Sequence, residues 1–217
     1  MTKEAIFSAI RDIGIVPVVR TESAESAIKS IEAIYRGGIR AAEITMTVPG
    51  ALRALEKVAD EFGGQIVLGA GTVLDPETAR ACMLAGAEFF VTPSLKIATI
   101  EIAQRYSKVV VPGALTPTEV LTAWEAGADA VKIFPAGAMG GAKYIRALRA
   151  PFPHIEMVPT GGVSLESAAD FLKAGACAVG VGNELIDSAT IRAGDYGVFE
   201  RRARQFIDVI KAARSDC

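Results

Sequence analysis

Lys132 stands apart from the other eight lysines because it lies inside an apolar segment, residues 130–134. The other lysines occupy helical or boundary segments, where a charged head group stays in water. Burying an ammonium group is costly unless it is paired or loses its proton, and burial lowers a lysine pKa. A neutral amine in a dry pocket attacks ketones and forms a Schiff base. Lys132 is therefore a candidate nucleophile; a structural ion pair, or a lysine reaching out at a rim, is the alternative.

Glu43 is an acid in a similar position, within the apolar segment 41–45. A carboxylate that faces the same site as Lys132 can pair with the amine or move protons for it. A proton shuttle would also be a partner of the lysine, so the sequence leaves both roles open.

Glycine-rich segments follow two of the later apolar runs and offer backbone N–H groups to anions. Gly161 and Gly162 lie in the first of these segments, and Gly182 and Asn183 in the second. Such loops bind phosphate where they lead into a helix N-terminus. Two glycines also suit a plain strand-to-helix turn, which is the alternative for this pair.

Two further positions could bind an anion. Gly71 and Thr72 end the third run, where backbone amides and a hydroxyl could bind a carboxylate, or where the chain merely turns before Asp75. Arg20 ends the first run and supplies a cation for phosphate or carboxylate, or else forms an ion pair at a rim.

The metal ligands of a zinc-dependent aldolase or hydrolase are not apparent. Such a site needs two or three histidines, or histidine with carboxylates. His154 is the only histidine, and it precedes a predicted strand rather than following one. We therefore expect no metal and no cofactor, and carbonyl activation by an amine.

The composition describes an ordinary globular chain. Of its 217 residues, 51% are apolar and 22% charged, which excludes a disordered protein. A net charge of −2 without a dense basic stripe argues against nucleic acid, and no apolar stretch approaches the ~20 residues of a membrane span. Cys82, Cys177 and Cys217 form no CxxC pair, and the N-terminus lacks an apolar signal core. We expect a reducing cytoplasm.

The elements that would position these residues repeat along the chain. A helical stretch ends at glycine, and a short β-branched run follows. Glycine past a helix end supplies a left-handed cap, and the apolar run suits a strand buried on both faces. Eight such runs are spaced 20 to 26 residues apart and start near Ile15, Ala41, Ile66, Phe89, Val109, Ala130, Glu156 and Ala178.

Eight uninterrupted β-then-α units predict an α/β fold, a closed (β/α)8 TIM barrel forming a single domain over residues 1–217. An open doubly wound sheet usually shows a GxGxxG turn after its first strand, and residues 18–21 read VVRT instead. Residues 3–10 predict an extra N-terminal helix. Helix starts are predicted at Asp75, Thr116 and Ser164. In a barrel the chemistry lies at the C-terminal strand ends.

Five segments on successive strand ends together resemble the 2-keto-3-deoxy-6-phosphogluconate (KDPG) aldolases. The wider family includes the 6-phosphogalactonate and 4-hydroxy-2-oxoglutarate aldolases. The segments read EITMTVP at 43–49, GAGTV at 69–73, VTP at 91–93, VKIFP at 131–135 and PTGGV at 159–163. The resemblance runs from about residue 13 to residue 187.

This resemblance implies a class I aldolase, a carbon–carbon lyase that needs no metal. Lys132 would attack the C2 ketone of a 2-keto-3-deoxy-6-phospho sugar acid. Glu43 would move protons while the imine forms and take the C4 hydroxyl proton as the C3–C4 bond breaks. Glyceraldehyde 3-phosphate leaves, and pyruvate follows after reprotonation and hydrolysis.

The resemblance also implies the substrate-binding residues. Thr72 and the Gly71 backbone would bind the carboxylate, Pro93 would line the pyruvate pocket, and the glycine loops would hold the phosphate with Arg20 nearby. Thr47 stands where many relatives have an arginine that touches the carboxylate. The full set is Arg20, Thr47, Gly71, Thr72, Pro93, Phe134, Thr160, Gly161, Gly162, Gly182 and Asn183.

Thr160 is the residue that gluconate-type members tend to have, which favours KDPG, with 4-hydroxy-2-oxoglutarate as a further substrate. The alternatives are a 6-phosphogalactonate aldolase and a non-catalytic phospho-sugar-binding barrel. A metal-dependent phosphate-binding barrel lacks its ligands here. The resemblance further implies a homotrimer, with no nucleic-acid or membrane partner.

Overall fold

The strands form two parallel sheets. The computed structural model describes residues 1–215, so Cys217 lies outside the described residues. A curled six-stranded sheet has the order β5-β4-β3-β2-β1-β9, and a three-stranded sheet has the order β6-β7-β8. The strands are β1 Ile15–Val19, β2 Ala41–Thr45, β3 Val67–Gly71, β4 Phe89–Val91, β5 Val109–Val111, β6 Gly113–Ala114, β7 Val131–Ile133, β8 Met157–Pro159 and β9 Val179–Val181.

The fifth predicted strand is divided, and this corrects the expectation of eight unbroken strands. Pro112 separates β5 from β6, and proline has no N–H to donate to a ladder. β5 pairs with β4, whereas β6 pairs with β7. The result is a six-stranded sheet beside a three-stranded one, rather than one continuous ladder.

Two seams lie between the sheets, and a few hydrogen bonds cross each of them. At the first, the Asp129 amide donates to the Val110 carbonyl at 3.1 Å, and the Gly113 amide donates to Thr92 Oγ1 at 3.0 Å. At the second, the Cys177 amide donates to the Met157 carbonyl at 3.0 Å, and Thr160 forms an isolated parallel bridge with Gly180. These bonds join the two sheets around a common interior.

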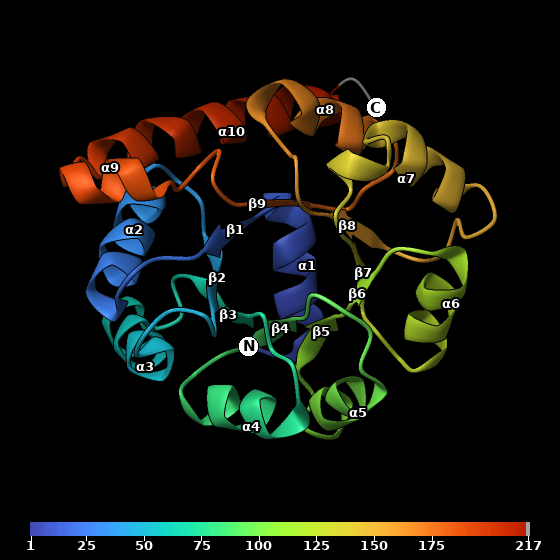
Figure 1. Ribbon diagram of the computed structural model, residues 1–217, viewed down its shortest axis with the longest axis horizontal. Helices are drawn as coiled ribbons and strands as arrows, with labels where there is room; N and C mark the ends of the chain where they lie inside the picture. The colour runs from blue at the N-terminus through green and yellow to red at the C-terminus, as the bar shows by residue number, and fades with distance from the viewer. Residues whose placement is uncertain (216–217) are drawn as a thin grey trace.

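Helices surround the strands (Figure 1). Sequence signals set their starts: Asp75 caps α4, Thr116 forms a capping box with Glu119 in α6, and Ser164 caps α8, all as predicted. The helices are α1 Lys3–Ile13, α2 Ala24–Arg36, α3 Ala51–Phe62, α4 Pro76–Leu84, α5 Ile97–Arg105, α6 Pro117–Glu125, α7 Ala142–Arg149, α8 Leu165–Lys173, α9 Ser188–Ala193 and α10 Gly197–Ser215, with a 3-10 turn, η1, at Gly137–Met139. None of the helices within residues 1–215 is both long and apolar enough to cross a membrane.

Helix α1 lies across the middle of the ring in Figure 1 and closes one end of the interior. Its buried residues Ile6 and Ile10 pack against inward-facing side chains of the strands. Those side chains are Val16, Ala41, Val67, Phe89, Val91, Val109, Val111, Ala130, Val158 and Ala178. The extra N-terminal helix predicted from the sequence therefore covers this end of the interior and acts as its apolar plug.

Alternation along each strand determines which side chains face inward, because successive side chains point to opposite faces. Ala41 and Ala130 belong to the interior cluster, so Glu43 and Lys132, each two residues further along, face the same interior nearer the C-terminal strand ends. The apolar half of the interior thus packs on α1, and the polar half lies at the opposite end.

Candidate active site

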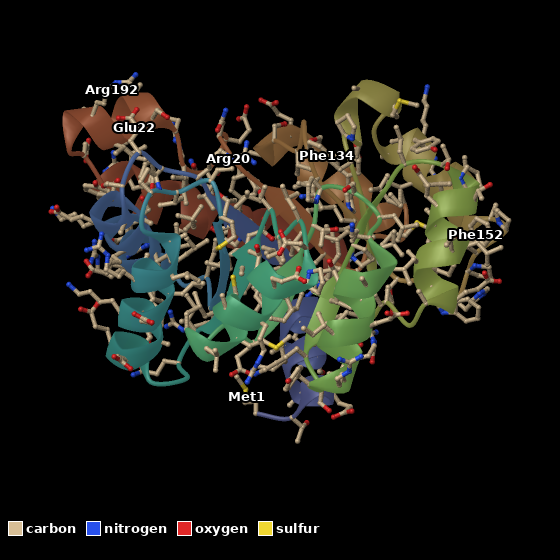
Figure 2. The ribbon with its side chains drawn as sticks, turned by 60° about the horizontal axis from the view of Figure 1, so that its bottom comes forward. Met1, Arg20, Glu22, Phe134, Phe152 and Arg192 are labelled. Atoms are coloured by element: carbon tan, nitrogen blue, oxygen red, sulfur yellow. The ribbon has the colours of Figure 1, made fainter. Side chains whose placement is uncertain are left out.

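A cavity of about 310 Å³ opens at the C-terminal ends of the strands. Figure 2 shows Arg20 and Phe134 at this end of the molecule, with Met1 at the opposite end. Ten of the predicted site residues line the cavity: Arg20, Thr72, Pro93, Lys132, Phe134, Thr160, Gly161, Gly162, Gly182 and Asn183. Residues that are distant in sequence therefore meet at one end of the barrel-like interior.

Lys132 reaches this cavity from β7, where it pairs with Gly113 on one side and Val158 on the other. Only 6% of the residue is exposed. Its Nζ lies 5.0 Å from the centroid of the Phe134 ring, and no ion pair is formed with it among residues 1–215. Burial lowers the Lys132 pKa, the Glu43 charge raises it, and the Arg20 charge lowers it. The net direction is downward, which favours the neutral, nucleophilic amine.

Glu43 lies beneath the cavity, on β2, with 2% of its surface exposed. Its Oε1 is buried without a hydrogen-bond partner in the described structure. It occupies an interior pocket that shares Val18, Thr160 and Gly180 with the cavity above. Burial raises the Glu43 pKa, against the opposing charges of Lys132 and Arg20. A carboxyl group of raised pKa takes up a proton more readily than an ordinary surface glutamate does, as a proton shuttle requires.

Gly71 and Thr72 connect β3 to the cavity. The Gly71 carbonyl accepts a hydrogen bond from the Met46 amide at 2.8 Å, and Gly71 itself lies against Glu43. Thr72 has a φ of 56°, a left-handed conformation that is unusual for a β-branched residue. Such strain is often found where a fold holds a side chain in place for function. Here it accompanies a threonine that lines the cavity.

The glycine loops border the cavity on the side of β8 and β9. Gly161 and Gly162 have φ values of 84° and 78°, which glycine adopts without penalty. The Gly161 carbonyl accepts a hydrogen bond from the Gly137 amide at 2.8 Å, which ties this loop to η1. The loop leads into α8, whose N-terminus favours anions.

Three predicted residues fall outside the cavity lining: Glu43, which lies beneath the cavity, Gly71 and Thr47. Gly71 lies against Glu43 rather than at the cavity surface. Thr47 is exposed beyond the end of β2, and its hydroxyl lies 2.8 Å from the Thr45 hydroxyl. Thr47 is therefore not brought together with the other predicted residues.

Four lining residues were missed by the sequence reasoning, namely Val18, Val163, Gly180 and Glu184. Period-two alternation could have found two of them: Gly180 lies two residues before Gly182, and Val18 lies two before Arg20. Glu184 follows the predicted Asn183 and adds an exposed carboxylate to the rim. Val163 carried no signal beyond its place after the glycine pair.

The remaining reactive residue types lie elsewhere. His154 is exposed just before β8, with its ring 4.8 Å from that of Trp124. Burial raises the thiol pKa of both Cys82 and Cys177 to about 12, so neither is a ready nucleophile. Among residues 1–215, no cluster of histidine, cysteine and acidic side chains is arranged to hold a metal ion.

The arrangement combines a buried amine, a buried acid and anion-binding loops around one cavity. An amine of lowered pKa can form an imine with a ketone, and a nearby carboxyl group can move the protons that this requires. Arg20 and the glycine loops can bind negative groups at either end of a small ligand. This chemistry suits an acidic, phosphorylated keto compound.

Comparisons with known proteins show which family the chain is similar to. Residues 6–201 match the family model described as KDPG and KHG aldolase. The chain is 31% identical to a 2-dehydro-3-deoxy-phosphogluconate aldolase of Treponema pallidum, over 94% of this chain and 97% of that protein. It is 36% identical to a 2-dehydro-3-deoxy-6-phosphogalactonate aldolase of Escherichia coli, over 92% and 94%.

A solved structure is also similar. The KDPG aldolase of Legionella pneumophila, with pyruvate captured as a covalent carbinolamine, superposes with a TM-score of 0.85 at 27% identity, over 94% of this chain and 97% of that chain. The match to the family model covers most of the sequence, in agreement with the five motifs at the strand ends. The chain therefore belongs to the KDPG and KHG aldolase family.

Proposed function

We propose that this protein is a class I aldolase that reversibly cleaves KDPG to pyruvate and glyceraldehyde 3-phosphate. The observation that carries the proposal is Lys132, a buried lysine of lowered pKa that lines an open cavity above a buried glutamate. Family membership supports the reaction, and the Legionella relative holds pyruvate covalently.

The proposed reaction begins when the neutral Lys132 Nζ attacks the C2 ketone. The carbinolamine loses water, with Glu43 moving the protons, and leaves a protonated imine. Glu43 then takes the C4 hydroxyl proton, and C4 becomes the aldehyde carbon of glyceraldehyde 3-phosphate. The electrons of the broken C3–C4 bond move into the imine to give an enamine. Protonation at C3 and hydrolysis release pyruvate and restore the amine.

Binding of the two acidic groups is assigned to opposite parts of the cavity. We assign the substrate carboxylate to Thr72 and the backbone at Gly71, beside the buried Glu43 side chain. We assign the phosphate to the loops at 161–162 and 182–183, with Arg20 at the rim. Pro93, Phe134 and Thr160 would line the space between. The position of Thr47 gives no support to a direct contact with substrate.

One of the comparisons supports a second candidate substrate. The Escherichia coli relative at 36% identity acts, by its name, on the 6-phosphogalactonate compound, the C4 epimer. 4-Hydroxy-2-oxoglutarate is a third candidate, since it has the same keto-acid end. Measuring kcat/KM for the three compounds on one preparation ranks them, and KDPG is expected to be highest.

We further propose that the two sheets form one closed eight-stranded (β/α)8 barrel domain that works without a metal, as a homotrimer in the cytoplasm. The bonds across both seams and the free Cys82 and Cys177 are in keeping with this. Turnover is expected to survive EDTA, and light scattering is expected to give three times the mass of the chain. Inhibition reversed by zinc or magnesium, or the mass of a monomer, would contradict these points.

The test of the mechanism is incubation with pyruvate and borohydride, followed by intact mass and peptide mapping. One reduced pyruvate adduct on Lys132 is expected. The Lys132→Ala variant should keep its fold by circular dichroism and lose both the adduct and turnover. A folded wild-type protein that forms no adduct would leave the binding-only alternative in its place.

A further inference from the structure

Gly71 occupies the position where β3 passes closest to the Glu43 carboxyl group. β2 and β3 pair in parallel, with Glu43 opposite Gly69 and Thr45 opposite Gly71. A Cβ atom at position 71 would lie 2.5 Å from Glu43 Oε1, 2.7 Å from its Cδ and 3.2 Å from its Cγ. These are its three nearest neighbours, so the space that a side chain would take is filled by the glutamate.

Backbone conformation does not explain a glycine here. Gly71 lies within a regular strand, and its φ is outside the left-handed region, unlike the φ of Gly161 and Gly162. Any residue could adopt this backbone. A side chain at 71 would instead meet the end of the flexible Glu43 side chain. Because real Cβ atoms essentially never approach another heavy atom within 3.0 Å, the carboxyl group would have to move.

The surroundings of Glu43 leave its carboxyl group few other constraints. No hydrogen bond fixes Oε1 in the described structure, and the charged groups that act on it are Lys132 from β7 and Arg20 after β1. The rest of its pocket comes from α1, β1, β4, β5, β8 and β9, and is apolar or uncharged: Phe7, Ile10, Val16, Val18, Phe89, Val91, Val111, Val158, Thr160 and Gly180. Shape, rather than a hydrogen bond, is therefore what locates Oε1.

We infer that Gly71 is a positioning residue: the missing side chain at 71 sets where the Glu43 carboxyl group lies beneath the cavity. This goes beyond any contact of the Gly71 backbone with substrate, and it rests on the proposed role of Glu43 in proton transfer. A methyl group at 71 displaces the carboxyl group, and a displacement of about 1 Å costs roughly 10²-fold in rate.

The test is Gly71→Ala, measured for kcat, for its pH dependence and for the reduced pyruvate adduct on Lys132. We expect kcat to fall about 10²-fold. The pH dependence of kcat should also change, because the displaced carboxyl group lies at a different distance from the charges of Lys132 and Arg20. The final extent of adduct should match the wild type, since Lys132 keeps its place. An unchanged kcat and pH profile in Gly71→Ala would overturn the inference.

Glu43→Gln supplies the matched background, because glutamine has nearly the same size but cannot act as a base. Gly71→Ala should lower Tm by a similar amount in both backgrounds, since the crowding remains. Its effect on kcat should disappear in Glu43→Gln. An equal loss of kcat in both backgrounds would show that Gly71 acts through the fold alone. Absence of turnover in the wild type would instead contradict the proposed function.

Discussion

Replacing Glu43 by glutamine should separate two roles of this side chain: proton transfer during the reaction, and the effect of its negative charge on the Lys132 pKa. Glu43 is 2% exposed, and its Oε1 has no hydrogen-bond partner in the described structure. The other acid at the cavity, Glu184, is an exposed residue of the rim, so it is poorly placed to take over proton transfer. The variant should therefore lose the full contribution of a positioned acid–base group.

A positioned acid–base group contributes about 10²- to 10⁴-fold in rate. With no substitute inside the pocket, we expect a fall in kcat toward the upper end, about 10³- to 10⁴-fold. This corresponds to roughly 4–5.5 kcal/mol in the barrier, at about 1.4 kcal/mol for each factor of ten. The same variant removes a negative charge that raises the Lys132 pKa. The amine should then lose its proton at a lower pH than in the wild type.

Three assays measure these effects. Pyruvate release, followed with lactate dehydrogenase and NADH, gives kcat, and NMR in D₂O gives the exchange of pyruvate methyl protons. Both should slow in Glu43→Gln. The pH at which borohydride traps half of the maximal pyruvate adduct should move downward. Methyl exchange at the wild-type rate would refute a role for Glu43 in proton transfer, and an upward move in the trapping pH would refute the electrostatic coupling.

Three further changes test other parts of the structure. Arg20→Met removes a positive charge that lowers the pKa of both Lys132 and Glu43, so the whole pH–rate profile should move to higher pH; an unmoved profile would contradict this. Asp187→Ala removes the N-cap of α9, where hydrogen bonds hold the Asp187 pKa well below its usual range. It should reduce the free energy of unfolding by roughly 0.5–2 kcal/mol at neutral pH. A depressed acid pKa stabilises the fold fully above its ordinary value of 3.8, so the charge-dependent part of this difference should shrink progressively as the pH falls below 3.8 toward the lower pKa of the folded protein; denaturant titrations at several pH values check it. Ile10→Ala opens the apolar plug at the closed end and should cost roughly 2–5 kcal/mol, so a Tm close to that of the wild type would count against the packing described for α1.

The element order and the buried lysine could be predicted from the sequence because each has a local signal. Glycine caps and capping side chains such as Asp75 and Thr116 mark helix ends without any tertiary contact. Lys132 stands out because a charge interrupts an apolar run. The residues that follow the strands then meet at one site, because the C-terminal ends of parallel strands all lie on the same side of the sheet.

The features that the sequence did not predict depend on contacts between distant segments. β5 and β6 are separate strands because the chain changes its pairing partner at Pro112, from β4 to β7. In the sequence alone, residues 109–114 look like one strand. Gly180 was missed although its spacing from Gly182 was available, because among small apolar residues buried on both faces nothing marks which alternate residue lines the cavity. The relation of Gly71 to Glu43 depends on the register of two strands, which no local pattern specifies.

The division of the strands into two sheets has a consequence for how the activity could change over evolution. Lys132 belongs to the three-stranded sheet, and Glu43 belongs to the six-stranded one. Their separation is therefore set by how the sheets close against each other at Asp129–Val110 and Thr160–Gly180, rather than by a single hydrogen-bonded ladder. Substitutions at these junctions can retune the amine and the acid together while leaving both residues in place. Selection for a new aldehyde partner would then be expected to gather changes at both junctions, of which Asp129–Val110 lies outside the cavity lining and Thr160–Gly180 belongs to it.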